Sequence, residues 1–150
     1  KLFFQSIILG GVISLSLVAC GQSKKAAVSS TPAHLIQASV KRTLPGRPEG
    51  NIEKKYRFLI RWQSSEKPEQ AYFVNDGQWM PCAVNKFGSR YSTSEIKKGD
   101  TLQLIASSSS VVSAMRPNIN STNLIFKTSK SSWQTLLVSK IEKEPDVEMP

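Results

Sequence analysis

The thiol and imidazole groups are the first candidates for chemistry, because a cysteine beside a histidine can form an activated nucleophile. The 150-residue chain has two cysteines, Cys20 and Cys82, and a single histidine, His34. A reactive thiol also needs a lowered pKa, but His34 ends a polar N-terminal segment that is distant from Cys82 in the sequence. We therefore predict that Cys82 is a small hydrophobic residue in a strand. A disulfide to a partner chain is the alternative.

Metal and carboxylate sites are not indicated either. Zinc and copper sites need clustered histidines and cysteines, which a single histidine and one further cysteine cannot supply. Asn75, Asp76 and Asp100 offer oxygen ligands but lie in separate predicted turns, which already explain these residue types. Five glutamates could provide paired carboxylates for glycoside hydrolysis, but all lie in or near loops, which favours solvated charge: Glu49, Glu53, Glu66, Glu69 and Glu95. We expect no enzyme and no metal.

A long apolar segment near the start of the sequence points to export. No residue from Leu2 to Ala19 is charged, and Lys1 precedes this run, a pattern typical of a signal sequence. Its end, Leu17-Val18-Ala19-Cys20, resembles the lipobox of bacterial lipoproteins. The resemblance implies that residues 1–19 are a signal peptide and that Cys20 carries a covalent lipid, the only cofactor expected. The alternative is an uncleaved transmembrane helix, since about 20 apolar residues span a bilayer.

The residues after the cysteine bear on location. In the lipoprotein class, Gly21 in place of an aspartate implies the outer membrane, and the basic Lys24-Lys25 pair favours a domain facing the periplasm. Surface exposure is the alternative. Export also argues against nucleic acid as a partner, although the formal net charge is +9.

A basic run is the first candidate for partner binding. Between Lys41 and Arg61 lie seven lysines and arginines, at positions 41, 42, 47, 54, 55, 57 and 61, against two glutamates. Period-two alternation places Arg57 and Arg61 on one outer sheet face, where they could bind an acidic partner. The alternative is a solvated face that charge keeps soluble. The acidic segment from Glu142 to Glu148 could dock on this run in its own or a neighbouring molecule.

Aromatic residues form the second candidate. Tyr72, Phe73, Trp79, Phe87 and Tyr91 gather around one predicted hairpin. Alternation sends about half of them outward, where aromatic rings serve as interface anchors or stack on sugars. Tyr72 and Trp79 are therefore predicted to contact a partner, with packing in the core as the alternative.

These candidates depend on a set of short strands. Residues 20–34 have the composition of a flexible tether, residues 35–142 are predicted to form one domain, and residues 143–150 are predicted to be a frayed polar tail. Seven strands are expected, the first with Ile36, Ala38 and Val40 on one side, and Asp76-Gly77 suits a type I′ hairpin turn. The predicted ranges are 35–44, 56–62, 71–75, 78–84, 101–106, 123–128 and 133–140. Short strands separated by turn signals predict an all-β, immunoglobulin-like antiparallel β-sandwich of six or seven strands.

Two functions from different classes follow. The first is a membrane-anchored module that binds protein in an envelope assembly, such as a secretion machine. The second is a binder of glycan or of an anionic envelope polymer, acting through exposed aromatic and arginine side chains.

Overall fold

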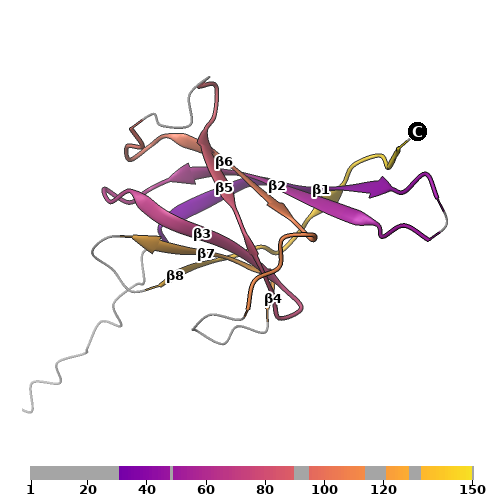
Figure 1. Cartoon of the computed structure of the whole chain (residues 1–150). Coiled ribbons are helices and arrows are strands. Elements are labelled where there is room, and N and C mark those ends of the chain that lie inside the picture. Colours follow the sequence, from indigo (N-terminus) through magenta and orange to yellow (C-terminus); the bar gives the residue numbers. More distant parts are fainter. Residues whose placement is uncertain (1–30, 48, 90–94, 114–120, 129–132, 150) are drawn as a thin grey trace, which may run out of the picture.

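Two β-sheets face each other in the structure, a computed structural model that describes residues 31–47, 49–89, 95–113, 121–128 and 133–149. The described residues contain no helix (Figure 1). Ten strands are present: β1 (Ala33–Leu44), β2 (Glu53–Trp62), β3 (Pro68–Asn75), β4 (Gln78–Pro81), β5 (Ala83–Lys86), β6 (Thr101–Ser107), β7 (Asn123–Thr128), β8 (Gln134–Leu137), β9 (Glu142–Lys143) and β10 (Val147–Glu148). The prediction of an all-β sandwich is confirmed.

The strand order is that of an immunoglobulin-like sandwich. One sheet runs β10-β1-β2-β6-β5, with β9 also paired to β1, and the other runs β4-β3-β7-β8. In immunoglobulin domains the first, second, fifth and fourth strands form one sheet, and the third, sixth and seventh form the other. Here β1, β2, β6 and β5 correspond to the first set and β3, β7 and β8 to the second, with β4 as an added edge strand.

The core confirms β2 as a central strand. Tyr56, Phe58, Ile60 and Trp62 are all buried, and β2 pairs with β1 on one side and β6 on the other. From the opposite sheet Phe73 meets the rings of both Tyr56 and Phe58, each at a centroid distance of 4.7 Å. The inward residues of β2 therefore join the two sheets, and its outward residues are left for other contacts.

The hairpin between β3 and β4 also forms as predicted. Asp76 and Gly77 have φ angles of 49° and 75°, and two consecutive positive φ values are characteristic of a type I′ turn. Val74 and Trp79 are registered partners across it. Pro81 ends β4 at the sheet edge, as expected for a residue without an amide donor, and the chain then crosses to β5 in the other sheet. The predicted strand 78–84 is therefore two strands.

The first strand differs from the prediction in register and length. A β-bulge between Leu35 and Gln37 leaves Ile36 49% exposed, whereas Ala38 is buried. A bulge adds one unpaired residue, so the expected alternation through Ile36 is wrong. Ala33 and His34, assigned to the tether from the sequence, already belong to β1.

The C-terminal segment forms strands as well. Both β9 and β10 pair with β1 in parallel, so the prediction that this segment frays is wrong for residues 143–149. We call residues 142–149 the tail. It lies along the edge of β1, which matches the alternative of docking within its own molecule.

Candidate interaction surfaces

The outer face of β2 carries a row of basic side chains. Arg57 pairs with Ser39 of β1 and with Ile105 of β6, whereas Arg61 pairs with His34 and Thr101. Both arginines are exposed, and Leu59 lies between them. The structure therefore places Arg57 and Arg61 on one face, as the alternation predicts.

This row continues toward the far end of β1. Lys41 and Lys55 are registered partners on the same face, although like charges directly opposite each other destabilise a sheet. We call Lys41, Lys55, Arg57 and Arg61 the basic band. Within the described residues, none of the four takes part in an ion pair. The basic band thus places four cationic side chains on one face of the sheet.

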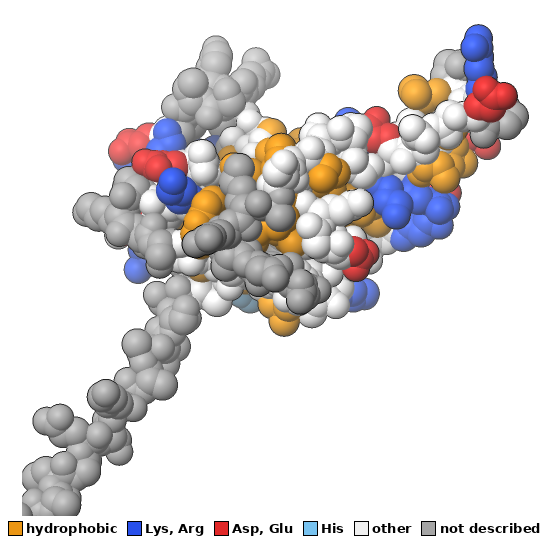
Figure 2. Space-filling model, turned by 60° about the horizontal axis from the view of Figure 1, so that its bottom comes forward, with side chains coloured by type: hydrophobic (Ala, Val, Ile, Leu, Met, Phe, Trp, Pro, Cys, Tyr) orange, Lys and Arg blue, Asp and Glu red, His pale blue; other side chains and the backbone are white. Residues whose placement is uncertain are grey.

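At Lys41 and Lys55 the band runs into a projecting arm of β1 and β2, which we define as residues 41–55. The arm extends past the rest of the sandwich (Figure 1), and Figure 2 shows lysine and arginine side chains gathered along it. The arm also exposes an apolar residue, Ile52, at 50%. The arm therefore combines positive charge with apolar surface.

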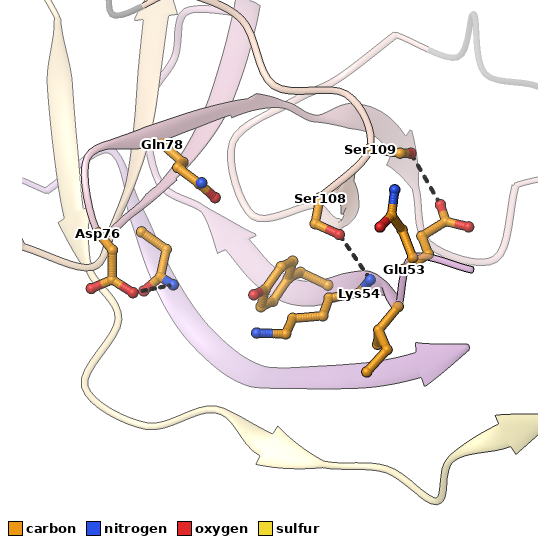
Figure 3. A pocket seen from close by; sticks show the side chains of 10 residues that line it. Glu53, Lys54, Asp76, Gln78, Ser108 and Ser109 are labelled. Atoms are coloured by element: carbon orange, nitrogen blue, oxygen red, sulfur yellow. Dashed lines mark hydrogen bonds between the residues drawn. The ribbon is translucent and has the colours of Figure 1, made fainter. Parts of the chain in front are cut away.

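A polar hollow lies at the base of the arm (Figure 3). Its volume is about 900 Å³. Asp76 and Gln78 of the hairpin turn lie on one side, and Glu53 and Ser109 on the other (Figure 3). The remaining lining residues are Asn51, Ile52, Lys54, Tyr56, Asn75 and Ser108. No sequence pattern predicts this hollow, because only the fold brings these three distant segments together.

Hydrogen bonds from two serines keep the Glu53 carboxylate of the hollow in its ionised form. Glu53 accepts hydrogen bonds from the hydroxyls of Ser107 at 2.6 Å and Ser109 at 3.2 Å, which lower the pKa of its carboxyl below the usual value. Burial, and secondarily the charge of Asp76, raise the pKa of Tyr56. An ionised carboxylate and a neutral phenol are suited to hydrogen bonding rather than to proton transfer near neutral pH.

No known protein family, curated protein or solved structure matches this chain. Its surfaces must therefore be interpreted from their own chemistry.

The predicted aromatic anchors are covered. Tyr72 and Trp79 point away from the main core, but they are only 8% and 2% exposed, so the expected exposure is wrong for both. They pack with Trp133 at ring-centroid distances of 6.0 and 6.3 Å, and the amide of Val112 donates to the Trp79 carbonyl at 2.8 Å. We call these four residues with Val74 and Ile125 the aromatic cluster. Two loop segments that follow β6 and β7 thus convert an outer face into a second small core.

The other three aromatic residues predicted around the hairpin differ in exposure or lie outside the described residues. Phe73 is fully buried in the main core, whereas Phe87 is 57% exposed. Tyr91 lies outside the described residues.

Cys82 has the environment of a packing residue. It contacts the main core, and burial raises the pKa of its thiol to about 12. His34 is on β1 and Cys82 directly precedes β5, so β2 and β6 separate them in the sheet order. The thiol therefore has neither a lowered pKa nor an adjacent imidazole.

Three of the acidic residues considered from the sequence form contacts in or near turns. Asp100 accepts from the amide of Lys97 at 2.8 Å and pairs with Lys86 at 3.0 Å, and these contacts lower the pKa of its carboxyl. Glu66 accepts a hydrogen bond from Thr128, and Glu95 pairs with Lys97. In the described part of the chain, no three metal-ligating side chains form a group.

The chain enters the sandwich at the end opposite the arm. The carbonyl of Pro32 accepts hydrogen bonds from the amides of Gln63 and Ser64, at 2.8 and 3.3 Å. From there β1 runs twelve residues into the arm, a length of roughly 40 Å at about 3.3 Å per residue. Cys20 lies outside the described residues. Within those residues, no helix has the length and apolar character needed to cross a membrane.

Proposed function

We propose that the protein is a non-enzymatic lipoprotein, anchored through lipid on Cys20, whose β-sandwich binds a protein partner in an envelope assembly such as a secretion machine. The observation that carries this proposal is the placement of the basic arm at the end of the sandwich opposite the point where the chain enters. An anchor at the N-terminal end allows the arm to extend away from the membrane. We further propose outer-membrane attachment with the domain in the periplasm.

The lengths of the tether and of β1 decide how far from the membrane the arm can lie. A tether of about 12 residues has an average extension on the order of 20 Å, and β1 adds roughly 40 Å at its rise per residue. The arm would then act several tens of ångströms from the lipid surface. At this distance the arm could contact a periplasmic protein or the periplasmic part of another membrane protein.

The surface chemistry favours a protein over a glycan. Sugar binding commonly uses exposed aromatic faces, whereas Tyr72 and Trp79 are buried in the aromatic cluster and Phe87 is the exposed aromatic side chain among those predicted and described. The arm and the tail beside it instead expose the aliphatic residues Ile52, Val147 and Met149 next to basic side chains. Methionine and arginine are enriched at protein interfaces relative to the rest of the surface.

Affinity capture of the lipidated protein from its native envelope after mild crosslinking tests the proposal. We expect a stoichiometric protein partner that is lost when Cys20→Ser removes the anchor. Recovery of the chain alone with bound glycan or polymer would support the polymer binder instead.

A charge-reversal pair tests whether the basic band takes part. Arg57→Glu with Arg61→Glu should weaken the capture by about tenfold or more, whereas Lys67→Glu, an exposed change in the loop after β2, should leave it intact. Capture that survives the double reversal would exclude the band as the contact surface.

A further inference from the structure

The tail is attached to β1 with little apolar burial. Its two strands each contribute only two residues to the ladder with β1. Val147 and Met149 are 39% and 54% exposed, and Glu144 is half-buried. Because apolar burial is the main stabilising contribution in folding, the tail is held more weakly than the strands that line the core.

Polar contacts provide most of the attachment. The amide of Glu144 donates to the Val40 carbonyl at 2.9 Å, and its carboxylate accepts a hydrogen bond from the Ser39 hydroxyl at 2.5 Å. Two residues further on, Asp146 forms an ion pair and hydrogen bonds with the Arg42 guanidinium. Main-chain pairing plus two acidic side chains two positions apart is a pattern that other extended acidic segments can reproduce.

The edge under the tail is complementary to such a segment. β1 would be the outermost strand of its sheet without the tail, and an unpaired edge is a template for an added strand. Lys41 and Arg42 are on β1, and their registered partners Lys55 and Lys54 are on β2. An acidic strand that adds to this edge therefore meets positive charge along its length.

We propose that the edge of β1 from Ser39 to Leu44 is a docking site for an extended acidic segment of a partner protein, which pairs in parallel and displaces the tail. The tail serves as a resident substitute that protects the edge until the partner arrives. This inference rests on the proposed function, because it names the kind of partner segment that the module binds.

Displacement is feasible because the resident strand is short. Weakly buried edge elements open at a small fraction of the global unfolding free energy. The tail is a tethered competitor with an effective concentration of order 1 mM. For a free peptide that binds the edge with a Kd of about 0.1 mM, removal of the tail should therefore strengthen binding by about tenfold.

Fluorescence anisotropy with a labelled peptide of residues 141–149 tests the site directly. The protein is the lipidated chain in detergent, either intact or ending at Ile141. We expect binding to the shortened chain about tenfold tighter than to the intact chain. If the shortened chain does not fold, the full-length Asp146→Arg chain, which lacks the tail ion pair, provides the same comparison.

Charge reversal supplies the matched control. Arg42→Glu in the shortened chain should abolish binding of the natural peptide and restore binding of a peptide carrying Asp146→Arg. Absence of binding to both the shortened and the Asp146→Arg chains, or binding that ignores Arg42→Glu, would overturn the proposal. If heparin, a polyanion, displaced the labelled peptide as well as the unlabelled peptide does, the site would be assigned to a polymer. A dimer of intact chains that exchange their tails would assign it to a second copy of this chain.

Envelope capture separates this inference from the proposed function. A partner captured equally by the intact and Arg42→Glu chains would retain the proposed function and overturn the edge site. Peptide binding as expected, with no partner captured from the envelope, would support the acidic-strand specificity and overturn the assembly role.

Discussion

The two outer faces of the sandwich show opposite outcomes of the same sequence pattern. On β3 and β4 the outward residues Tyr72 and Trp79 are buried beneath Val112 and Trp133. On β2 the outward residues Arg57 and Arg61 are exposed. Alternation decides on which side of a sheet a residue lies, but a distant loop decides whether that side is covered. The aromatic cluster therefore stabilises the fold, whereas the arginines of the basic band stay exposed to solvent.

Truncation of the largest covered side chain is the strongest test of this comparison. Trp79→Ala should lower the free energy of unfolding by about 3–5 kcal/mol, the usual cost of removing a large buried aromatic. Arg57→Ala on the open face should change it by less than about 0.5 kcal/mol. Urea unfolding followed by far-ultraviolet circular dichroism measures both, and similar values for the two variants would refute the distinction.

Cys82 extends the comparison to the crossing between the two sheets. Burial raises its thiol pKa from 9.0 to about 12, and each pKa unit changes the thiolate fraction by about tenfold. At pH 8, reaction of the folded protein with iodoacetamide should be about 1000-fold slower than reaction of the urea-unfolded chain. A Cys20→Ser background removes the second thiol. Comparable rates in both states would show that Cys82 is accessible and would revive the disulfide alternative.

Charge on the open face should influence association more than stability. The double variant Arg57→Glu and Arg61→Glu should weaken partner capture by about tenfold or more, because both charges are exposed on one surface. Raising the salt concentration from 0.1 M to 1 M should have a similar effect on the natural chain, because it shortens the screening length from about 10 to 3 Å. Capture that is unaffected by salt would show that the contact is apolar and would favour the exposed aliphatic residues instead.

The sequence was sufficient for features that depend on neighbouring residues. The alternation of β2 predicted its buried face, and Asp76-Gly77 predicted a turn with two positive φ angles. Features that depend on distant segments were either missed or named only as alternatives. The burial of Trp79 requires Val112 from the loop after β6, and the ordering of the tail requires Arg42 opposite Asp146. The polar hollow likewise combines the arm with the β3–β4 turn and the serines after β6.

The smallest expected effect is a change in how firmly the tail pairs with β1, and this pairing should depend on pH. The Arg42 guanidinium lowers the pKa of the Asp146 carboxyl through a hydrogen bond and through its charge. A carboxyl whose pKa is lower in the folded state contributes stability above its unfolded pKa of about 3.9 and loses it as pH falls through the lower folded value. Hydrogen exchange at the amides of Glu144 and Met149, which donate to β1, should therefore show protection at pH 6 that disappears at strongly acidic pH while β2 stays protected.

Asp146→Asn is the matched variant, because it keeps the shape of the side chain and removes the charge. Asp146→Asn should reduce the exchange protection of the two tail amides at pH 6, and the protection that remains should depend little on pH. Protection of the Phe58 amide in the core should change little. The same exchange experiment separates the tail from the aromatic cluster, since Trp79→Ala should expose amides on β3 and β4 and leave those of the tail unchanged. Tail protection that persists in Asp146→Asn would mean that the main-chain ladder alone holds the edge, and a partner segment would then need no acidic residue to replace it.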